Sequence, residues 1–242
     1  MQLSTFFSFV LDALAPPRRT EKIVRTLSLS ELYALALPQD EHTSPHEHLS
    51  ILPYHHNSVA ALVWEVKYYA HKRALTLAGE MLAETLLAIA FEEIGRVIVI
   101  PIPIHPKRRK ERGHNQTELL CKAALEQLSE KTSLRKGPRI SSLWSARPFS
   151  SKSFSSDEFE YLPDALVRVR HTAPQQGLPK HRRLKNVKNT MAVQSAAGFN
   201  LKDHVCVVVD DVATTGATFA EARRALKACG ARRVYCVALA GT

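Results

Sequence analysis

The sequence predicts an α/β fold in which a parallel β-sheet is flanked by helices, with a small helical region at the N-terminus. Three apolar runs rich in β-branched residues, at 97–104, 205–209 and 233–239, are typical of buried parallel strands. Helical apolar spacing fills the stretches between and beside them, at 59–90 with a basic break at 71–73, at 117–129 and at 219–229. Strands that alternate with helices favour a parallel sheet.

The length of 242 residues favours one α/β domain with a small appendage. We expect residues 1–56 to form an N-terminal region of short helices and polar loops, and residues 57–242 to form the main domain. Serine fills eight of the sixteen positions in 141–156, which predicts a flexible surface insertion near 135–160.

Composition excludes several classes of protein. No apolar run reaches the roughly 18 residues that span a bilayer, and residues 3–14 lack the preceding basic charge of a secretory signal, so they fit a surface-packed helix better. The four cysteines are widely spaced, which favours free buried thiols in a reducing cytoplasm over a zinc site or a disulfide framework. Five histidines between 42 and 56 fit a solvated loop better than a metal site. We therefore expect a cytoplasmic protein with no zinc and no membrane insertion.

The formal net charge of +10 favours polyanionic partners, either phosphorylated substrates or nucleic acid. Much of this charge is gathered in two stretches. Residues 107–112 read KRRKER, and residues 168–202 contain no acidic side chain but several lysines and arginines. Both stretches flank sequence that can carry an active site, so a phosphate-rich ligand is a sufficient explanation.

Residues 205–218, VCVVVDDVATTGAT, form the most informative stretch of the chain. The predicted strand ends at Asp210 and Asp211, and a loop of small and hydroxylic residues leads into the next helix. Gly216, the N–H groups of the helix start and the threonine hydroxyls can hold a phosphate. The two carboxylates can accept hydrogen bonds from sugar hydroxyls. An ordinary capped turn explains one acid and one hydroxyl, but not this whole set.

Two further segments have the chemistry of a phosphate site. The strand at 97–104 ends in Pro101 and Pro103 and is followed by guanidinium groups, whose forked donors suit a pyrophosphate. A solvated basic loop is the alternative. Residues 168–187 are polar, basic and interrupted by Pro174, Gly177 and Pro179, which is typical of a mobile loop or hairpin. Such a segment could act as a lid that excludes water, or it could bind nucleic acid.

The stretch VVVDDVATTGAT (207–218) resembles the phosphoribosyl-pyrophosphate (PRPP) signature of type I phosphoribosyltransferases. Together with PIPIHPKRRKERGHNQ (101–116) and RVRHTAPQQGLPKHRRLKNV (168–187), it resembles the ComF-like subfamily, which is named for a bacterial DNA-uptake competence protein. LVWEVKYYAHKR (62–73) is a weaker match. The resemblance covers about residues 54–240. Many members carry an N-terminal four-cysteine zinc module, whereas this sequence has no cysteine before Cys121.

The resemblance implies an enzyme that binds PRPP and Mg²⁺, the metal mainly through PRPP, and transfers phosphoribosyl to an unidentified nitrogenous acceptor with release of pyrophosphate. Asp210 and Asp211 would be the catalytic pair that holds the ribose. Whether the protein forms a homodimer is left open. His105 is either a proton-transfer group or a structural residue. The binding groups implied are Thr214, Thr215, Gly216, Ala217 and Thr218 for the 5-phosphate, Pro103, Ile104, His105, Arg108, Arg109 and Arg112 for the pyrophosphate, and Arg168, Arg170, Gln175, Arg182, Arg183 and Asn186 for the lid.

One detail and two alternatives accompany this interpretation. The family often has glycine where this chain has Ala217, and alanine fits there if its φ is negative. Fold does not fix function, so a non-catalytic PRPP or nucleotide sensor is one alternative. A factor that handles single-stranded DNA, linked to competence and DNA uptake, is the other.

Overall fold

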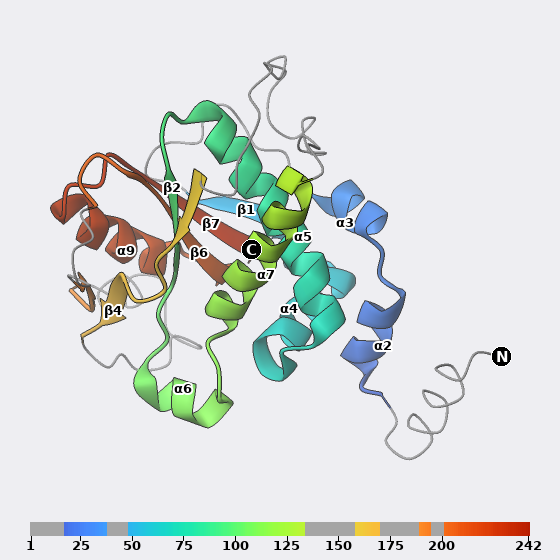
Figure 1. Ribbon diagram of the computed structural model, residues 1–242. Coiled ribbons are helices and arrows are strands. Elements are labelled where there is room, and N and C mark those ends of the chain that lie inside the picture. Colours follow the sequence, from blue (N-terminus) through green and yellow to red (C-terminus); the bar gives the residue numbers. More distant parts are fainter. Residues whose placement is uncertain (1–16, 38–47, 134–157, 170–188, 195–200) are drawn as a thin grey trace.

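The computed structural model describes residues 17–37, 48–133, 158–169, 189–194 and 201–242. Within them a five-stranded parallel sheet has the strand order β1-β7-β6-β2-β3, and β4 and β5 form a separate antiparallel pair (Figure 1). The predicted α/β class with a parallel sheet is confirmed. The strands are β1 (Leu49–Pro53), β2 (Val97–Pro101), β3 (Phe159–Tyr161), β4 (Leu166–Arg168), β5 (Met191–Val193), β6 (Val205–Ala213) and β7 (Arg233–Gly241).

Helices cover both faces of this sheet, because successive strand residues point to opposite sides. On β6, Val207 and Val209 pack toward one helical layer, whereas Cys206 and Val208 pack toward α9. Figure 1 shows α9 on one side of the sheet and α4, α5 and α7 on the other. The helices are α2 (Arg19–Thr26), α3 (Leu29–Leu35), α4 (Asn57–Tyr69), α5 (Lys72–Glu92), α6 (Pro106–Arg112), α7 (Gln116–Ser133) and α9 (Ala217–Ala228).

Helix α5 belongs to the core. Its length and composition would allow it to cross a membrane, but 78% of its most apolar window is buried in the fold. It packs closely against α7, where a Cβ added to Gly79 would lie 2.8 Å from the backbone carbon of Ala123. Its buried carboxylates share an ion pair with Lys131 of α7, which lies 2.7 Å from Glu80 and also pairs with Glu84.

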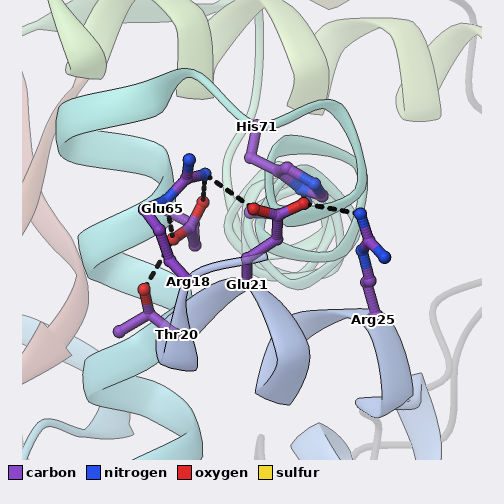
Figure 2. Close-up of polar contacts among 7 residues, drawn as sticks. Arg18, Thr20, Glu21, Arg25, Glu65 and His71 are labelled. Atoms are coloured by element: carbon purple, nitrogen blue, oxygen red, sulfur yellow. Dashed lines mark hydrogen bonds and ion pairs between the residues drawn. The ribbon is translucent and has the colours of Figure 1, made fainter. Parts of the chain in front are cut away.

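The N-terminal helices are fastened to α4 by a buried carboxylate. Glu65 accepts hydrogen bonds from Arg18 at 2.8 Å and from Thr20 at 2.6 Å (Figure 2). The guanidinium of Arg18 also stacks 3.6 Å from the ring centroid of Tyr69. The expectation of short helices in this region is confirmed by α2 and α3, while residues 3–14 lie outside the described part.

Several elements differ from the sequence expectations. Strand β6 continues four residues past Val209, because β7 runs on to Gly241 and supplies ladder partners for Asp210, Val212 and Ala213. Helix α9 begins at Ala217 instead of residue 219. Residues 49–53, expected in a polar loop, are β1, whose burial and pairing with β7 make it a sheet edge. Strand β3 and the β4–β5 pair were not predicted, because each of their strands has only three residues.

The basic segment 105–116, interpreted as a loop, contains helix α6. Pro106 is at its first position, where a fixed φ suits a helix start, and His105 caps it by accepting a hydrogen bond from the Lys107 amide at 3.2 Å. Gly113 ends it with a φ of 78°. The serine-rich stretch 141–156 lies outside the described residues, and the domain boundary at 56/57 stays a prediction.

Candidate functional site

The acidic pair lies where β6 extends beyond β2. The β2–β6 ladder ends at the pairing of Pro101 with Val209, and only the Ile102 amide continues it, donating to the Val209 carbonyl at 2.8 Å. Asp210 and Asp211 follow immediately. Because strand residues alternate, Asp210 continues the face that packs on α9, and Asp211 continues the face that packs on α4 and α7. The two carboxylates therefore have different neighbours.

Asp210 shares its surroundings with the ends of two other predicted segments. Arg168, the last residue of β4, donates from Nε to the Pro103 carbonyl at 2.7 Å. Burial lowers the pKa of Arg168, while the charge of Asp210 raises it and that of Arg108 lowers it. Burial, and then the neighbouring charge of Asp211, hold the pKa of Asp210 well above its ordinary value despite the nearby Arg168. The three sequence segments thus converge around Arg168, which contacts Pro103 and lies within the electrostatic influence of Asp210 and Arg108.

Asp211 is held by residues from α4 and α7. The Nζ of Lys67 lies 3.4 Å from its Oδ2, and Gln116 donates to the same oxygen from Nε2 at 3.3 Å. Gln116 in turn accepts from Arg112 at 3.3 Å. The carboxylate is buried, with 5% of its residue surface exposed. Asp211 is therefore fixed and charge-paired, in contrast to Asp210.

The predicted phosphate loop ends in a glycine whose geometry few other residues accept. Gly216 has a φ of 69° and directly precedes α9. A Cβ on it would also come within 3.0 Å of the Nδ1 of His48. Ala217 is the first residue of α9 and is not among the residues with positive φ, so the condition for alanine at this position is met. Thr214 is exposed, and Thr215 and Thr218 are half-buried, so their hydroxyls lie near the surface beside the helix start.

The segment predicted to hold pyrophosphate is braced by α7. The Ile102 carbonyl accepts from Thr117 Oγ1 at 2.7 Å and from Asn115 Nδ2 at 3.2 Å. Arg109 makes a forked ion pair with Glu118, with N–O distances of 2.7 and 3.0 Å. Pro103 lies beside Arg168, and His105 caps α6. Of the three predicted arginines, Arg108 lies near Arg168, whereas Arg109 and Arg112 are directed to Glu118 and Gln116.

Sequence reasoning missed two residues that hold the site. Lys67 lies within the weakly matching stretch 62–73, and Gln116 closes the stretch 101–116, yet neither was assigned a role. Their contacts to Asp211 join residues 95 or more positions apart, which no local pattern reveals. Of the lid residues only Arg168 is described; Arg170, Gln175, Arg182, Arg183 and Asn186 lie outside the described residues. The lid therefore stays a prediction.

The described side chains contain no gathered group of three or more His, Cys, Asp or Glu residues that could hold a metal ion. His42 and His46 lie outside this part of the chain, so the expectation of a zinc-free protein stays a prediction. Magnesium needs few protein ligands, since phosphate oxygens and water supply most of its shell. Because Asp211 is already held by Lys67 and Gln116, a magnesium ion at this site would be bound mainly through the oxygens of a phosphorylated ligand.

Comparisons with known proteins agree with this geometry. Residues 161–242, which include β4, β6 and the loop before α9, match the family model of the phosphoribosyl transferase domain. The C-terminal part of this α/β protein, residues 161–242, is thus similar to a phosphoribosyl transferase domain. The protein is also a distant homologue of the YhgH and competence F proteins.

The relatives differ in how much of the chain they match. DNA utilization protein YhgH of Salmonella typhi is 27% identical over 186 residues, which cover 74% of this chain and 66% of that protein. Competence protein F of Haemophilus influenzae is 28% identical over 142 residues, which cover 59% of this chain and 49% of that protein. YhgH of Escherichia coli (strain K12) is 28% identical over 141 residues, covering 57% and 48%. The chain spans about half to two thirds of the length of these relatives.

Proposed function

We propose that this protein is a phosphoribosyltransferase that binds PRPP with Mg²⁺ and transfers the phosphoribosyl group to a nitrogenous acceptor. The observation that carries the proposal is the convergence of three segments around Arg168. The acidic pair ends one segment, Pro103 and Arg108 belong to the second, and Arg168 begins the third. The match of residues 161–242 to the phosphoribosyl transferase domain supports the same proposal.

In the proposed reaction the bond between C1 of the ribose and the pyrophosphate oxygen breaks, and a bond from C1 to the acceptor nitrogen forms. The electron pair of the broken bond leaves with pyrophosphate, and where the acceptor nitrogen carries a proton, pyrophosphate or solvent takes it up. Bound Mg²⁺ would neutralise charge on the departing pyrophosphate. The chain's own groups would orient the sugar through Asp211 and bind phosphate at the start of α9. Arg108 and Arg168 would stabilise the negative charge that develops on the leaving group.

A pyrophosphate-release screen tests this proposal. The protein is incubated with Mg²⁺, PRPP and a panel of purines, pyrimidines, aromatic acids and amines, and released pyrophosphate is measured. We expect release that depends on one acceptor class and falls at least tenfold in Asp211→Asn. Asp203→Asn is a matched control, since Asp203 is exposed and has a φ of 65°, which asparagine tolerates. PRPP binding without release for any acceptor would favour a sensor.

A second candidate function is the handling of single-stranded DNA. Two observations favour it: the relatives are named DNA utilization and competence proteins, and the basic residues 107, 108 and 110 on α6 are exposed. Binding to an oligonucleotide through these cations would weaken steeply with salt. A salt-dependent affinity that is unchanged by Asp211→Asn, in a protein without pyrophosphate release, would select this function over the transferase.

A further inference from the structure

Helix α4 carries a group of exposed aromatic side chains in its last two turns. Trp64, Tyr68 and Tyr69 are 45%, 40% and 46% exposed. The rings of Trp64 and Tyr68 are in contact, with centroids 4.4 Å apart and planes at 46°. Tyr69 differs because its ring lies under the guanidinium of Arg18. Trp64 and Tyr68, which contact each other and are both partly exposed, are named here the aromatic pair.

This aromatic pair borders the acidic site through two separate contacts. Lys67, on the same face of α4, reaches the Oδ2 of Asp211 at 3.4 Å. Arg112 lies 5.3 Å from the ring centroid of Tyr68 and donates to Gln116, which donates to the same Asp211 oxygen. A molecule stacked on the aromatic pair would thus lie next to the carboxylate that is proposed to hold the ribose.

The charge beside the aromatic pair is positive. The positive charge of Lys67 is paired with the carboxylate of Asp211. Arg112 forms no ion pair with any carboxylate in the described part of the chain, and it contacts the Gln116 amide and the Tyr68 ring. A guanidinium in this setting can bind an anionic group in a forked geometry while aromatic faces hold a planar ring. The surface therefore suits a flat molecule that carries negative charge.

We propose that the aromatic pair and Arg112 form the acceptor subsite, and that the acceptor is a planar heterocycle bearing a carboxylate or a comparable anionic group. The inference rests on the proposed transferase function. It assigns Trp64 and Tyr68 to stacking and Arg112 to selection of charge. It also gives Arg112 a role different from pyrophosphate binding, which the direction of its side chain toward Gln116 and Tyr68 supports.

Tryptophan fluorescence tests this subsite directly. The chain has two tryptophans, so Trp144→Phe leaves Trp64 as the reporter. The Trp144→Phe variant is titrated with quinolinate, adenine and succinate, each with and without PRPP and Mg²⁺. Equilibrium dialysis gives the affinities. We expect saturable quenching by quinolinate, at least tenfold weaker binding of adenine, and none of succinate. Equal affinities for quinolinate and adenine would overturn the charge selection.

Variants separate the two parts of the subsite. Tyr68→Leu should weaken both ring compounds at least fivefold, because it removes a stacking face. Arg112→Gln should weaken quinolinate at least fivefold and leave adenine unchanged. Tyr69→Leu is the matched control, since this ring is equally exposed on the same helix but is covered by Arg18. A loss of quinolinate binding in Tyr69→Leu as large as that in Tyr68→Leu would contradict the assignment.

The remaining outcomes distinguish this inference from the proposed function. If calorimetry detects PRPP binding while no ring compound quenches Trp64, the inference fails and the transferase proposal stands. If quinolinate binds but PRPP does not, the transferase proposal fails and the surface is not an acceptor subsite. Quenching by an oligothymidylate but not by quinolinate would assign the surface to single-stranded nucleic acid. A dimer in sedimentation that shields Trp64 from acrylamide would assign it to a second copy of the chain.

Discussion

Asp210 and Asp211 are adjacent in the sequence, yet the alternation of β6 places them in different environments. Asp211 contacts Lys67 and Gln116, which offset the cost of its burial with an ion pair and a hydrogen bond. Burial and the charge of Asp211 raise the pKa of Asp210. The pair therefore combines a carboxylate that two side chains hold in place with a carboxyl whose pKa is raised.

Asp210→Asn is expected to stabilise the fold at neutral pH. Because the pKa of Asp210 is raised in the folded state, its contribution to stability is full below the unfolded pKa of about 3.9 and is lost as pH rises through the folded pKa. Asparagine cannot ionise. The free energy of unfolding of the variant should therefore exceed that of the wild type by about 1 kcal/mol at pH 8 and by less at pH 4. Urea unfolding at both pH values measures this. Equal or lower stability of the variant at pH 8 would contradict the buried-acid account, and Asp203→Asn serves as the control.

At the scale of elements, α4 is held between the N-terminal helices and the site, and Glu65 is the main contact on the N-terminal side (Figure 2). Burial opposes ionisation of Glu65, but hydrogen bonds from Arg18 and Thr20 outweigh it and lower its pKa. Stability from this group is therefore present above the unfolded pKa and is lost as pH falls through the folded pKa. The contacts of Glu65 with Arg18 and Thr20 should therefore stabilise the fold at neutral pH and weaken in acid.

Glu65→Gln should lower the free energy of unfolding by about 1–3 kcal/mol at pH 7, since it removes a charge-assisted pair while Arg18 stays partly in solvent. The difference from the wild type should shrink toward pH 3. Thermal unfolding followed by circular dichroism measures both values. A cost that is the same at pH 7 and pH 3 would show that packing, and not the ion pair, carries the effect.

The close contact between α5 and α7 depends on Gly79, which has no Cβ. A methyl at Gly79 would lie 2.8 Å from the backbone and Cβ of Ala123, closer than real contacts allow. Gly79→Ala should therefore cost about 1–3 kcal/mol of stability despite its better helix propensity. Ala123→Gly in the same protein should recover part of the loss, because it removes one of the clashing atoms. No recovery in this double variant would mean that the backbone clash alone sets the cost.

The sequence predicted those elements whose own patterns are strong. The apolar runs at 97–104 and 205–209 predict buried strands, and the spacing of Val59, Leu62, Val63 and Val66 predicts a helix with one buried face. The structure confirms a strand in each run and the helix, although β2 ends at Pro101. The end of β6 was misplaced, because its last residues are held by pairing with β7 and not by their own apolarity. β1 and β3 are edge strands whose existence depends on the sheet beside them.

At the scale of the whole molecule, the candidate site is assembled from segments far apart in the chain. The acidic pair, the loop at 214–218 and Arg168 could be proposed from motif chemistry, because each carries its own signal. Lys67 and Gln116 could not, since their role depends on how α4 and α7 pack beside the end of β6. The role proposed for the aromatic pair also depends on packing, because it follows from the position of α4 next to Asp211.

Calorimetric titration with PRPP and Mg²⁺ tests the central claim, that the end of β6 is a PRPP site, most directly. The account predicts saturable binding to the wild type and at least tenfold weaker binding to Asp211→Asn, with Asp203→Asn unchanged and all three proteins folded. Asp211 is fixed by Lys67 and Gln116, so its loss should remove ribose contacts without collapsing the strand. Absence of PRPP binding by the wild type, or wild-type affinity in a folded Asp211→Asn protein, would contradict the account.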